Sequence, residues 1–318
     1  MDKYYRYSNY LKEKYGVKTY KLPINLPMTC PNRDGNLGEN GCAFCGEDGA
    51  AFEKSNHSDS VTEQLLEVKE YIGDKYNAEK FIAYFQNFTN TYLPLNQLIN
   101  YVKEALKVDD IVEIALSTRP DCINKTYLNK LDQTVGNTNL SLELGLQTVN
   151  YHTLKDINRK HTLAEFIDAV LSTKTNNIDV GVHLILNLPG DECLDIKECA
   201  KILSALKVDT VKLHALYIRE NTEFGKRYQN NDLELISLNE YVKRVITFLE
   251  YLSPDIAVQR LLGRAPRDKT LFVNWGYGWG EIHQKIINQM DKRNTYQGKK
   301  FDYLQGKALR KFEIKNKS

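Results

Sequence analysis

The sequence predicts an α/β protein: a partial (β/α)6 barrel, similar to an incomplete TIM barrel, followed by a C-terminal extension. Six stretches with the apolar pattern of strands alternate with stretches of helical periodicity. Mostly apolar strands separated by helices favour a parallel sheet with right-handed crossovers. The six units span about 230 residues, whereas a closed eight-stranded barrel needs roughly 250 residues and two more units. We therefore expect an open barrel.

The elements follow one another in a regular order. A partly helical segment ends at Gly16, and a Ser60–Glu63 capping box opens the first amphipathic helix of the barrel. Pro94 lies near the start of the second helix, and another helix follows Pro120. The expected strands are 19–27, 80–86, 111–118, 140–147, 179–190 and 209–218, and the remaining helices are 93–106, 163–173, 193–206 and 237–252.

Three regions are expected along the chain. Residues 1–17 form a basic, aromatic N-terminal segment, and residues 18–255 form the barrel. Residues 256–318 form the extension, which contains the apolar stretch 257–263, an aromatic and glycine-rich stretch at 273–280, a helix at 281–290 and a basic tail.

The composition is that of a soluble globular chain. The 318 residues are 42% hydrophobic and 26% charged, which is enough to bury a barrel core. The sequence contains no run of eighteen apolar residues, so it predicts no membrane span. The first residues lack the apolar region of a signal peptide. We therefore expect a cytoplasmic protein with reduced cysteines. The oligomeric state is open.

Charge is concentrated at the two ends of the chain. Residues 1–22 hold six basic and two acidic side chains, and residues 291–318 hold nine basic and three acidic ones, although the formal net charge is only +2. Tyrosines are interleaved with these cations. Basic residues mixed with aromatic ones bind phosphates and stack on unpaired bases, so RNA is a candidate partner. The alternative is a solvated amphipathic face and a frayed lysine-rich tail.

Three of the six cysteines lie in one glycine-rich loop after the first strand. Cys30, Cys42 and Cys45 have the spacing C-x11-C-x2-C, and the aromatic Phe44 precedes the last cysteine. Converging thiols in a reduced chain indicate a metal or cluster site rather than a disulfide. Structural zinc and complete iron–sulfur sites use four protein ligands. Three thiols leave one coordination position open, unless a residue such as His57 closes a zinc site.

Polar residues recur near the carboxyl ends of the expected strands, where barrel active sites lie. Alternation places Glu143 and Gln147 on one face of the fourth strand. The same rule pairs His183 with Asn187, Lys212 with His214, and Ser117 with Arg119. A purely structural barrel would carry branched aliphatic residues there, so these side chains predict a polar cavity.

The chain resembles the radical S-adenosylmethionine (SAM) superfamily, in particular the branch of the elongator subunit and short bacterial relatives without its acetyltransferase-like domain. The resemblance rests on the three cysteines and on the stretches STRPD (117–121), LELGLQT (142–148), NRKH (158–161) and HLILNLPGDE (183–192). Three features depart from the superfamily pattern. The first cysteine interval is long, QNFTNTY (86–92) replaces a Gly-Gly-Glu stretch, and Asn187 stands where a glycine is common.

The resemblance implies a [4Fe–4S] cluster on Cys30, Cys42 and Cys45 that cleaves SAM to a 5′-deoxyadenosyl radical, with flavodoxin or ferredoxin as the electron donor. It also implies that Phe44 and Gln147 contact SAM. The backbone from Gln86 through Asn87 to Thr89 would meet the methionyl amine, Glu143 the ribose, Arg159 the carboxylate and Asn187 the adenine. His183, Lys212 and His214 would act on the substrate.

The function implied is modification of tRNA, at the wobble uridine side chain. Two alternatives remain at this point. One is a radical SAM enzyme that acts on a small molecule such as a porphyrin precursor. The other is a zinc-stabilised RNA-binding protein without catalysis.

Overall fold

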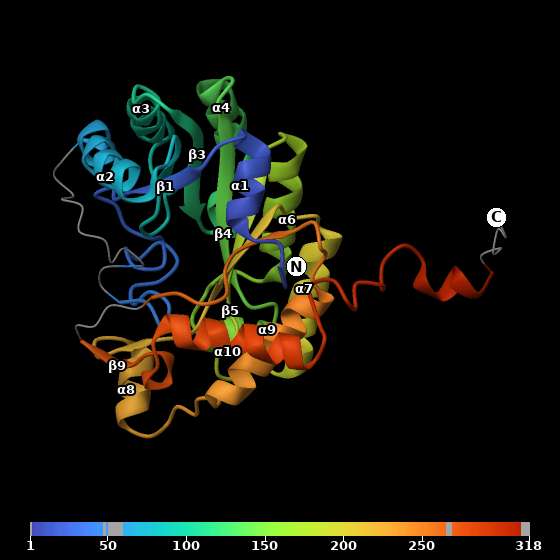
Figure 1. The fold of residues 1–318 in the computed structure, drawn as a ribbon. Helices are drawn as coiled ribbons and strands as arrows, with labels where there is room; N and C mark the ends of the chain where they lie inside the picture. The colour runs from blue at the N-terminus through green and yellow to red at the C-terminus, as the bar shows by residue number, and fades with distance from the viewer. Residues whose placement is uncertain (1, 47–48, 50–59, 265–268, 313–318) are drawn as a thin grey trace, which may run out of the picture.

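The computed structural model describes residues 2–46, 49, 60–264 and 269–312, and its centre is a seven-stranded parallel sheet (Figure 1). The strand order is β1-β2-β3-β4-β5-β6-β8. The expected α/β partial barrel is thus confirmed, and His57 lies outside the described residues. The strands are β1 Thr19–Ile24, β2 Lys80–Phe85, β3 Ile111–Thr118, β4 Asn139–Gln147, β5 Asp179–Ile185, β6 Thr210–His214 and β8 Ala257–Arg260.

The sheet has one strand more than the six expected from the sequence. β8 pairs in parallel with β6, with Thr210 opposite Ala257 and Lys212 opposite Arg260. It lies in the stretch expected to belong to the C-terminal extension. Its four residues, AVQR, are half polar and are too few to show a strand period.

Helices connect the strands and cover the sheet. Their starts carry the expected signals, since Ser60 and Glu63 form a capping box on α2 and Thr162 and Glu165 form one on α6. The short helices α5 and α8 were not expected. The α-helices are α1 Tyr7–Tyr15, α2 Val61–Tyr76, α3 Leu95–Ala105, α4 Lys125–Val135, α5 Tyr151–Asp156, α6 Leu163–Thr175, α7 Cys193–Ala205, α8 Glu223–Gln229, α9 Leu238–Tyr251 and α10 Trp279–Lys292.

The main apolar core lies between the sheet and its outer helices. It joins alternate strand residues such as Leu142, Leu144 and Val182 to helix residues such as Phe166 and Leu203. A second, smaller cluster forms beyond the carboxyl ends of the strands and includes Leu154, Ile157 and Phe224. Polar side chains share the inner face of the sheet, as the alternation of the strands predicted, with a third apolar cluster that joins Ile82, Tyr84 and Ala115 to Leu11 of α1.

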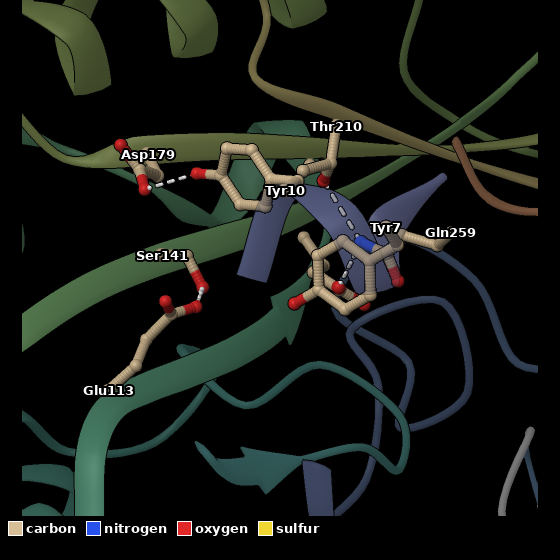
Figure 2. Close-up of a pocket in the computed structure, with 9 residues that line it drawn as sticks. Tyr7, Tyr10, Glu113, Ser141, Asp179, Thr210 and Gln259 are labelled. Atoms are coloured by element: carbon tan, nitrogen blue, oxygen red, sulfur yellow. Dashed lines mark hydrogen bonds between the residues drawn. The ribbon is translucent and has the colours of Figure 1, made fainter. Parts of the chain in front are cut away.

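Helix α1 closes the amino-terminal end of the inner face (Figures 1 and 2). The Tyr10 hydroxyl donates to Asp179 at 3.1 Å, and Lys14 binds Asp179 at 2.5 Å and Glu113 at 3.1 Å. Figure 2 shows Tyr7 and Tyr10 over a small pocket whose lining includes Glu143 and Gln259 from deeper in the sheet. Helix α1 thus covers the inner face at its amino-terminal end.

The N-terminal segment also covers an edge of the sheet. Val258 donates its N–H to the Tyr5 carbonyl at 2.8 Å, which occupies the free side of β8. Lys21 of β1 donates to Gln259 of β8 at 3.0 Å, so a side-chain contact links the two edge strands. Much of the tyrosine-rich start, expected to be a candidate RNA contact, is thus built into the fold.

Within the C-terminal extension, α10 packs against α9 and reaches the N-terminal segment, where Asp291 pairs with Lys3 at 2.8 Å. A two-stranded antiparallel sheet, β7 Ile218–Arg219 with β9 Thr270–Phe272, lies beyond the carboxyl ends of the strands (Figure 1). The 3₁₀ helices are η1 Pro120–Cys122, η2 Asn274–Gly276 and η3 Lys307–Phe312. Among the described residues, no helix has the length and apolar character needed to cross a membrane.

Candidate active site

The cysteine loop is built from tight turns. Arg33 donates its N–H to the Cys30 carbonyl at 2.8 Å, and Cys45 donates to the Cys42 carbonyl at 2.9 Å. Cys42 is buried, whereas Cys30 and Cys45 are half-buried. The Arg33 guanidinium donates to the Cys45 carbonyl at 2.6 Å, which ties the first turn to the last.

Backbone contacts fix this loop over the carboxyl ends of the strands. Ala43 donates its N–H to the Ile157 carbonyl, which follows β4, and Phe224, which follows β7, donates to the Ala43 carbonyl, each at 2.9 Å. The Asn158 amide donates to the Gly41 carbonyl at 2.8 Å, and the Asn32 amide donates back to the Asn158 carbonyl at 2.7 Å. The loop therefore lies over the open end of the barrel, as expected from its position after the first strand.

The thiols interact with one another and with nearby donors. Burial raises the pKa of Cys45, the charge of Cys42 raises it further, and Cys30 adds a smaller effect. Arg159 donates toward the Cys42 sulfur at 3.4 Å and Asn32 donates at 3.7 Å. In the described part of the chain, no three His, Cys, Asp or Glu side chains are gathered closely enough to form a metal site.

The donor set fits an iron–sulfur cluster. Such clusters take thiolate ligands and are tuned by N–H groups directed at sulfur. Here three thiols share one loop, and a guanidinium and an amide already face the sulfur of Cys42. The polar contacts of Asn32 and Asn158 hold the loop in place before any metal is bound.

Two buried arginines form a framework beneath the loop. Arg119 binds the Asp121 carboxylate through two bonds of 2.8 and 2.7 Å and donates to the Arg159 carbonyl at 2.9 Å. Arg159 donates to the Gly145 carbonyl at 2.6 Å, where His161 also lies at 3.2 Å. Burial lowers the pKa of His161 to about 3, with the charges of both arginines acting the same way. His161 is therefore neutral and serves the framework.

The sequence pointed to only part of this framework. Arg159 was expected to bind the SAM carboxylate, and Arg119 was placed on a polar strand face. Asp121, His161 and Asn32 were not given roles, although the first two lie in the stretches STRPD and NRKH. The buried Nη1 of Arg119 and Nε of Arg159 lack hydrogen-bond partners in the described structure. Both groups can still donate to a bound anion.

The loop after β2 is held by its own asparagines. Asn87 exchanges two hydrogen bonds with the Leu26 backbone, at 2.7 and 3.1 Å. Asn90 lies 2.9 Å from three backbone carbonyls, those of Phe85, Asn87 and Ser117. The side chain of Asn87, expected near SAM, is thus occupied by the fold.

The contacts of Gln86 and Thr89 neither support nor contradict the expected contact between this backbone and the methionyl amine of SAM. Gln86 donates its N–H to the Ile24 carbonyl at 3.1 Å, which continues the β1–β2 ladder. Thr89 is buried, and its carbonyl accepts from Tyr92 at 2.8 Å. A methionyl contact through this segment stays a prediction.

Glu143 is the centre of the polar inner face. It pairs with Lys21, accepts from His183 at 2.8 Å and from Gln259 at 2.7 Å, and lies 3.5 Å from Lys212. Burial would raise the pKa of Glu143, but the lysine charges and the His183 hydrogen bond hold it well below its usual value. Both oxygens already accept from the fold, so a bond to ribose would require one of these donors to move.

The three residues expected to act on the substrate come together beside Glu143. The rings of His183 and His214 lie 5.3 Å apart, and Lys212 donates to the Tyr84 hydroxyl at 3.0 Å. Arg260 donates to the His214 ring at 2.9 Å. Sequence reasoning missed Lys21, Tyr84, Gln259 and Arg260, whose partners lie on other strands far away in the sequence.

The remaining expected contacts lie at the ends of β4 and β5. Asn187 accepts the Leu216 N–H at 2.6 Å, and its buried side-chain nitrogen has no partner in the described structure. Gln147 has a left-handed backbone, with φ of 76°, and its amide lies beside Gly145. Phe44 packs against the small apolar cluster. Asn187 thus joins the end of β5 to the segment after β6, and Phe44 joins the cysteine loop to the apolar cluster.

An exposed aromatic patch follows the last strand. The Arg264 guanidinium lies 5.3 Å from the centre of the Trp279 ring, and Tyr277 and Trp279 are about half exposed, at 54% and 48%. Arg264 comes four residues after the carboxyl end of β8, and Trp279 begins α10. The patch therefore belongs to the same side of the molecule as the cysteine loop.

The profile of the Radical SAM superfamily matches residues 32–203, and the profile described as the Radical_SAM C-terminal domain matches residues 208–292. Together they cover most of the barrel and of the extension.

Individual proteins give the same picture. The uncharacterized protein YtqA of Bacillus subtilis is 34% identical over 305 residues, which cover 96% of this chain and 95% of that protein. The tRNA uridine(34) acetyltransferase of Methanocaldococcus jannaschii is 26% identical over 159 residues, covering 46% of this chain and 29% of that protein. The solved structure of Methanocaldococcus infernus Elp3 superimposes with a TM-score of 0.67 at 15% identity, covering 88% of this chain and 64% of that one.

Proposed function

Because the chain belongs to the radical SAM superfamily, we propose that it is an enzyme that modifies tRNA, at the side chain of the wobble uridine. Enzymes of this superfamily use a [4Fe–4S] cluster and SAM. The cysteine loop, fixed over the carboxyl ends of the strands, carries the cofactor part of the proposal. The RNA part is supported by the similarity to a tRNA uridine(34) acetyltransferase and by the exposed aromatic patch.

In this proposal Cys30, Cys42 and Cys45 would hold the cluster. When bound, the cluster and SAM supply radical chemistry that removes hydrogen from an unactivated carbon. Arg159, which faces Cys42 at 3.4 Å, stabilises negative charge on the sulfur. Arg119 holds the backbone of Arg159 in place through its bond of 2.9 Å.

The residues around the opening bind and orient the reactants. The unpartnered amide of Asn187 and the unpartnered guanidinium nitrogens of Arg119 and Arg159 offer donors to SAM. His183, Lys212 and His214 form the floor that the target group meets. The apolar cluster around Ile157 and Phe224 keeps water from one side of this space.

The RNA surface proposed is the patch of Arg264, Tyr277 and Trp279. Exposed aromatic rings stack on unpaired bases, and arginine adds charge attraction to phosphate. An anticodon loop presents unpaired bases, and the patch lies on the side from which the barrel is entered. We expect Trp279→Ala to weaken tRNA binding by about 1–3 kcal/mol. Leu194→Ala is the matched control, since Leu194 is also exposed, at 63%, but has no arginine partner among the described residues.

The experiment for the whole proposal is mass spectrometry of tRNA nucleosides from cells with and without the gene. We expect one modified uridine to change, and we expect Cys30→Ala to reproduce the deletion. Iron, sulfide and zinc are measured on the anaerobically purified protein. An unchanged nucleoside profile would refute tRNA modification and favour a small-molecule substrate. A protein that binds one zinc and no iron would refute the radical mechanism.

A further inference from the structure

The inner face of the barrel carries more positive than negative charge. Lys21, Lys212 and Arg260 project from β1, β6 and β8 toward the carboxylate of Glu143, whereas Glu113 and Asp179 lie at the amino-terminal end of the same face and pair with Lys14. Glu143 is shared by both lysines, by His183 and by Gln259. One negative charge thus faces three cations.

Among these three cations, Arg260 has the fewest partners that offset its positive charge. Its Nη2 contacts the His214 ring at 2.9 and 3.3 Å, and its buried Nε has no hydrogen-bond partner in the described structure. No carboxylate of the described chain forms an ion pair with it. Burial lowers the pKa of Arg260, which reflects the cost of holding this charge away from water.

Lys212 is in a similar position. It donates to the neutral Tyr84 hydroxyl at 3.0 Å and reaches Glu143 only at 3.5 Å. Burial lowers the pKa of Lys212 to about 7, and the charges of Arg260 and Lys21 act in the same direction, against that of Glu143. An added negative charge would relieve both Lys212 and Arg260.

A chain of contacts across the sheet links these cations to the cysteine site, and Lys212 and His214 are not fully buried. Lys212 is the register partner of Arg260 on one side and of His183 on the other, and His183 is the register partner of Gly145. The Gly145 carbonyl accepts from Arg159, which also faces Cys42. Along β6, Lys212 and His214 keep part of their surface exposed between fully buried apolar neighbours.

We propose that Lys212, His214 and Arg260 form a binding site for an oxyanion, a carboxylate or phosphate group carried by the substrate. Two cations and a ring nitrogen on adjacent strands can bind such a group from two sides, and the attraction is strong in a partly dehydrated site. The proposal rests on the proposed function, because the anion belongs to the molecule that is modified. It places the reacting carbon near that group, under the cysteine loop.

The test measures anion binding without RNA. Cluster-loaded protein with saturating SAM and no reductant is unfolded by heat at constant ionic strength, while sodium acetate or sodium phosphate replaces sodium chloride. Saturating SAM fills the site for its own carboxylate. We expect a saturable rise in the unfolding midpoint with at least one of the two anions, since a ligand that binds the native state stabilises it.

The variants locate the effect. We expect Arg260→Gln and Lys212→Met to weaken the anion response at least tenfold, and Lys212→Arg to keep it. Arg227→Gln is the matched control, because Arg227 is a surface arginine already paired with Asp156. A response to acetate alone assigns a carboxylate, and a response to phosphate alone assigns a phosphate. No response in the wild type, or an equal response in Arg260→Gln, would overturn the proposal.

The folding of the variants gives an independent reading. If Lys21, Lys212 and Arg260 together carry excess positive charge, Arg260→Gln and Lys212→Met should not lower the unfolding midpoint in chloride. Each substitution removes one cation that repels the other two. A lower midpoint in both would count against the proposal. The RNA question is separate, since it is decided by the nucleosides of the Cys30→Ala strain and does not enter the anion titration.

Discussion

Gly145 is the residue at which the two halves of the site meet. Its carbonyl accepts from Arg159, and a Cβ at this position would lie 2.6 Å from Nη2 of Arg159. A side chain at this position would require the guanidinium, which also faces Cys42 at 3.4 Å, to shift.

We expect Gly145→Ala to displace Arg159, to lower stability by about 1–3 kcal/mol through overpacking, and to reduce the iron bound per chain after anaerobic reconstitution. Gly73→Ala is the control. Its Cβ would have 3.9 Å of space to Phe81, and alanine in the middle of α2 should stabilise the protein by about 0.5–1 kcal/mol. Urea unfolding and iron analysis provide the measurements. Full iron content in Gly145→Ala would show that Arg159 can move freely.

Asp191 is a buried acid with a consequence for pH dependence. Burial raises its pKa to about 6, although Thr153 and Thr148 lie near enough to lower it. Neither carboxylate oxygen has a hydrogen-bond partner among the described residues. The fold therefore favours the neutral acid. Its contribution to stability is present below about pH 4 and is lost as the pH rises through 6, because the unfolded chain releases the proton first.

The expected loss is at most about 3 kcal/mol, from a shift of roughly two units. We therefore predict that Asp191→Asn is more stable than the wild type at pH 7 and that this advantage disappears near pH 4. Urea unfolding between pH 4 and 7.5 measures the difference between the two proteins. Asp168→Asn, on the exposed side of α6, is the control and should show no such trend. An equal pH dependence for Asp191→Asn and the wild type would refute the assignment.

At the scale of elements, α1 acts as a plug for the amino-terminal end of the barrel. Lys14 neutralises Glu113 and Asp179, while Tyr15 and Ser141 donate to Glu113. Glu113 is only 3% exposed. Its charge is tolerated because cation and hydroxyls surround it.

Lys14→Met should therefore destabilise the protein by about 2–4 kcal/mol, because it leaves a buried carboxylate without its cation. Lys12→Met is the control on the same helix, at an exposed position. Chemical denaturation of both variants provides the comparison. If the two lose the same small amount of stability, the plug is held by its tyrosines and not by charge.

The elements show which parts of the fold were predictable. The six expected strands and the capped helices follow from apolar period and capping residues, which are local signals. The roles of Lys21 and Lys14 were not predictable, because a lysine near a chain end reads as solvated until its distant partners, Glu143 and Glu113, are placed. β8 was hidden for the same reason, since Gln259 and Arg260 face the barrel interior.

The sequence predicted which polar side chains share the inner face, but not the contacts that they make. The alternation of side chains along β4, β5 and β6 is sufficient to place Glu143, His183 and Lys212 on one face of the sheet. It could not show that Glu143 would be saturated by four donors, or that Asn87 would hold the Leu26 backbone. Those contacts join residues far apart in sequence, and no local pattern encodes them.

At the scale of the whole molecule, the two basic ends of the chain differ in how much of each packs against the fold. The first is folded into the barrel. The second is partly docked, since Gln297 donates to the carbonyls of Ser253 and Ile256, and Tyr303 donates to that of Tyr251. From residue 307 to 312 all side chains are exposed, and this segment extends away from the body of the fold (Figure 1). Two cations of this segment, Lys307 and Arg310, pair with Asp302 on the surface, at 3.0 and 3.6 Å.

A truncation after residue 306 therefore tests the basic tail without damage to the fold, whereas a cut at 291 would remove the buried contacts of Thr295 and Gln297. We expect the free energy of unfolding to change by no more than about 0.5 kcal/mol. We expect tRNA affinity to fall and the slope of log affinity against log salt to become less steep by about 0.7–0.9 for each phosphate that the protein no longer neutralises. A full-length variant with glutamine at Lys307, Arg310, Lys311, Lys315 and Lys317 should behave like the truncation, because the effect is one of charge. An unchanged salt dependence of tRNA affinity in both proteins would show that the tail does not bind RNA and would leave the patch of Arg264, Tyr277 and Trp279 as the proposed RNA surface.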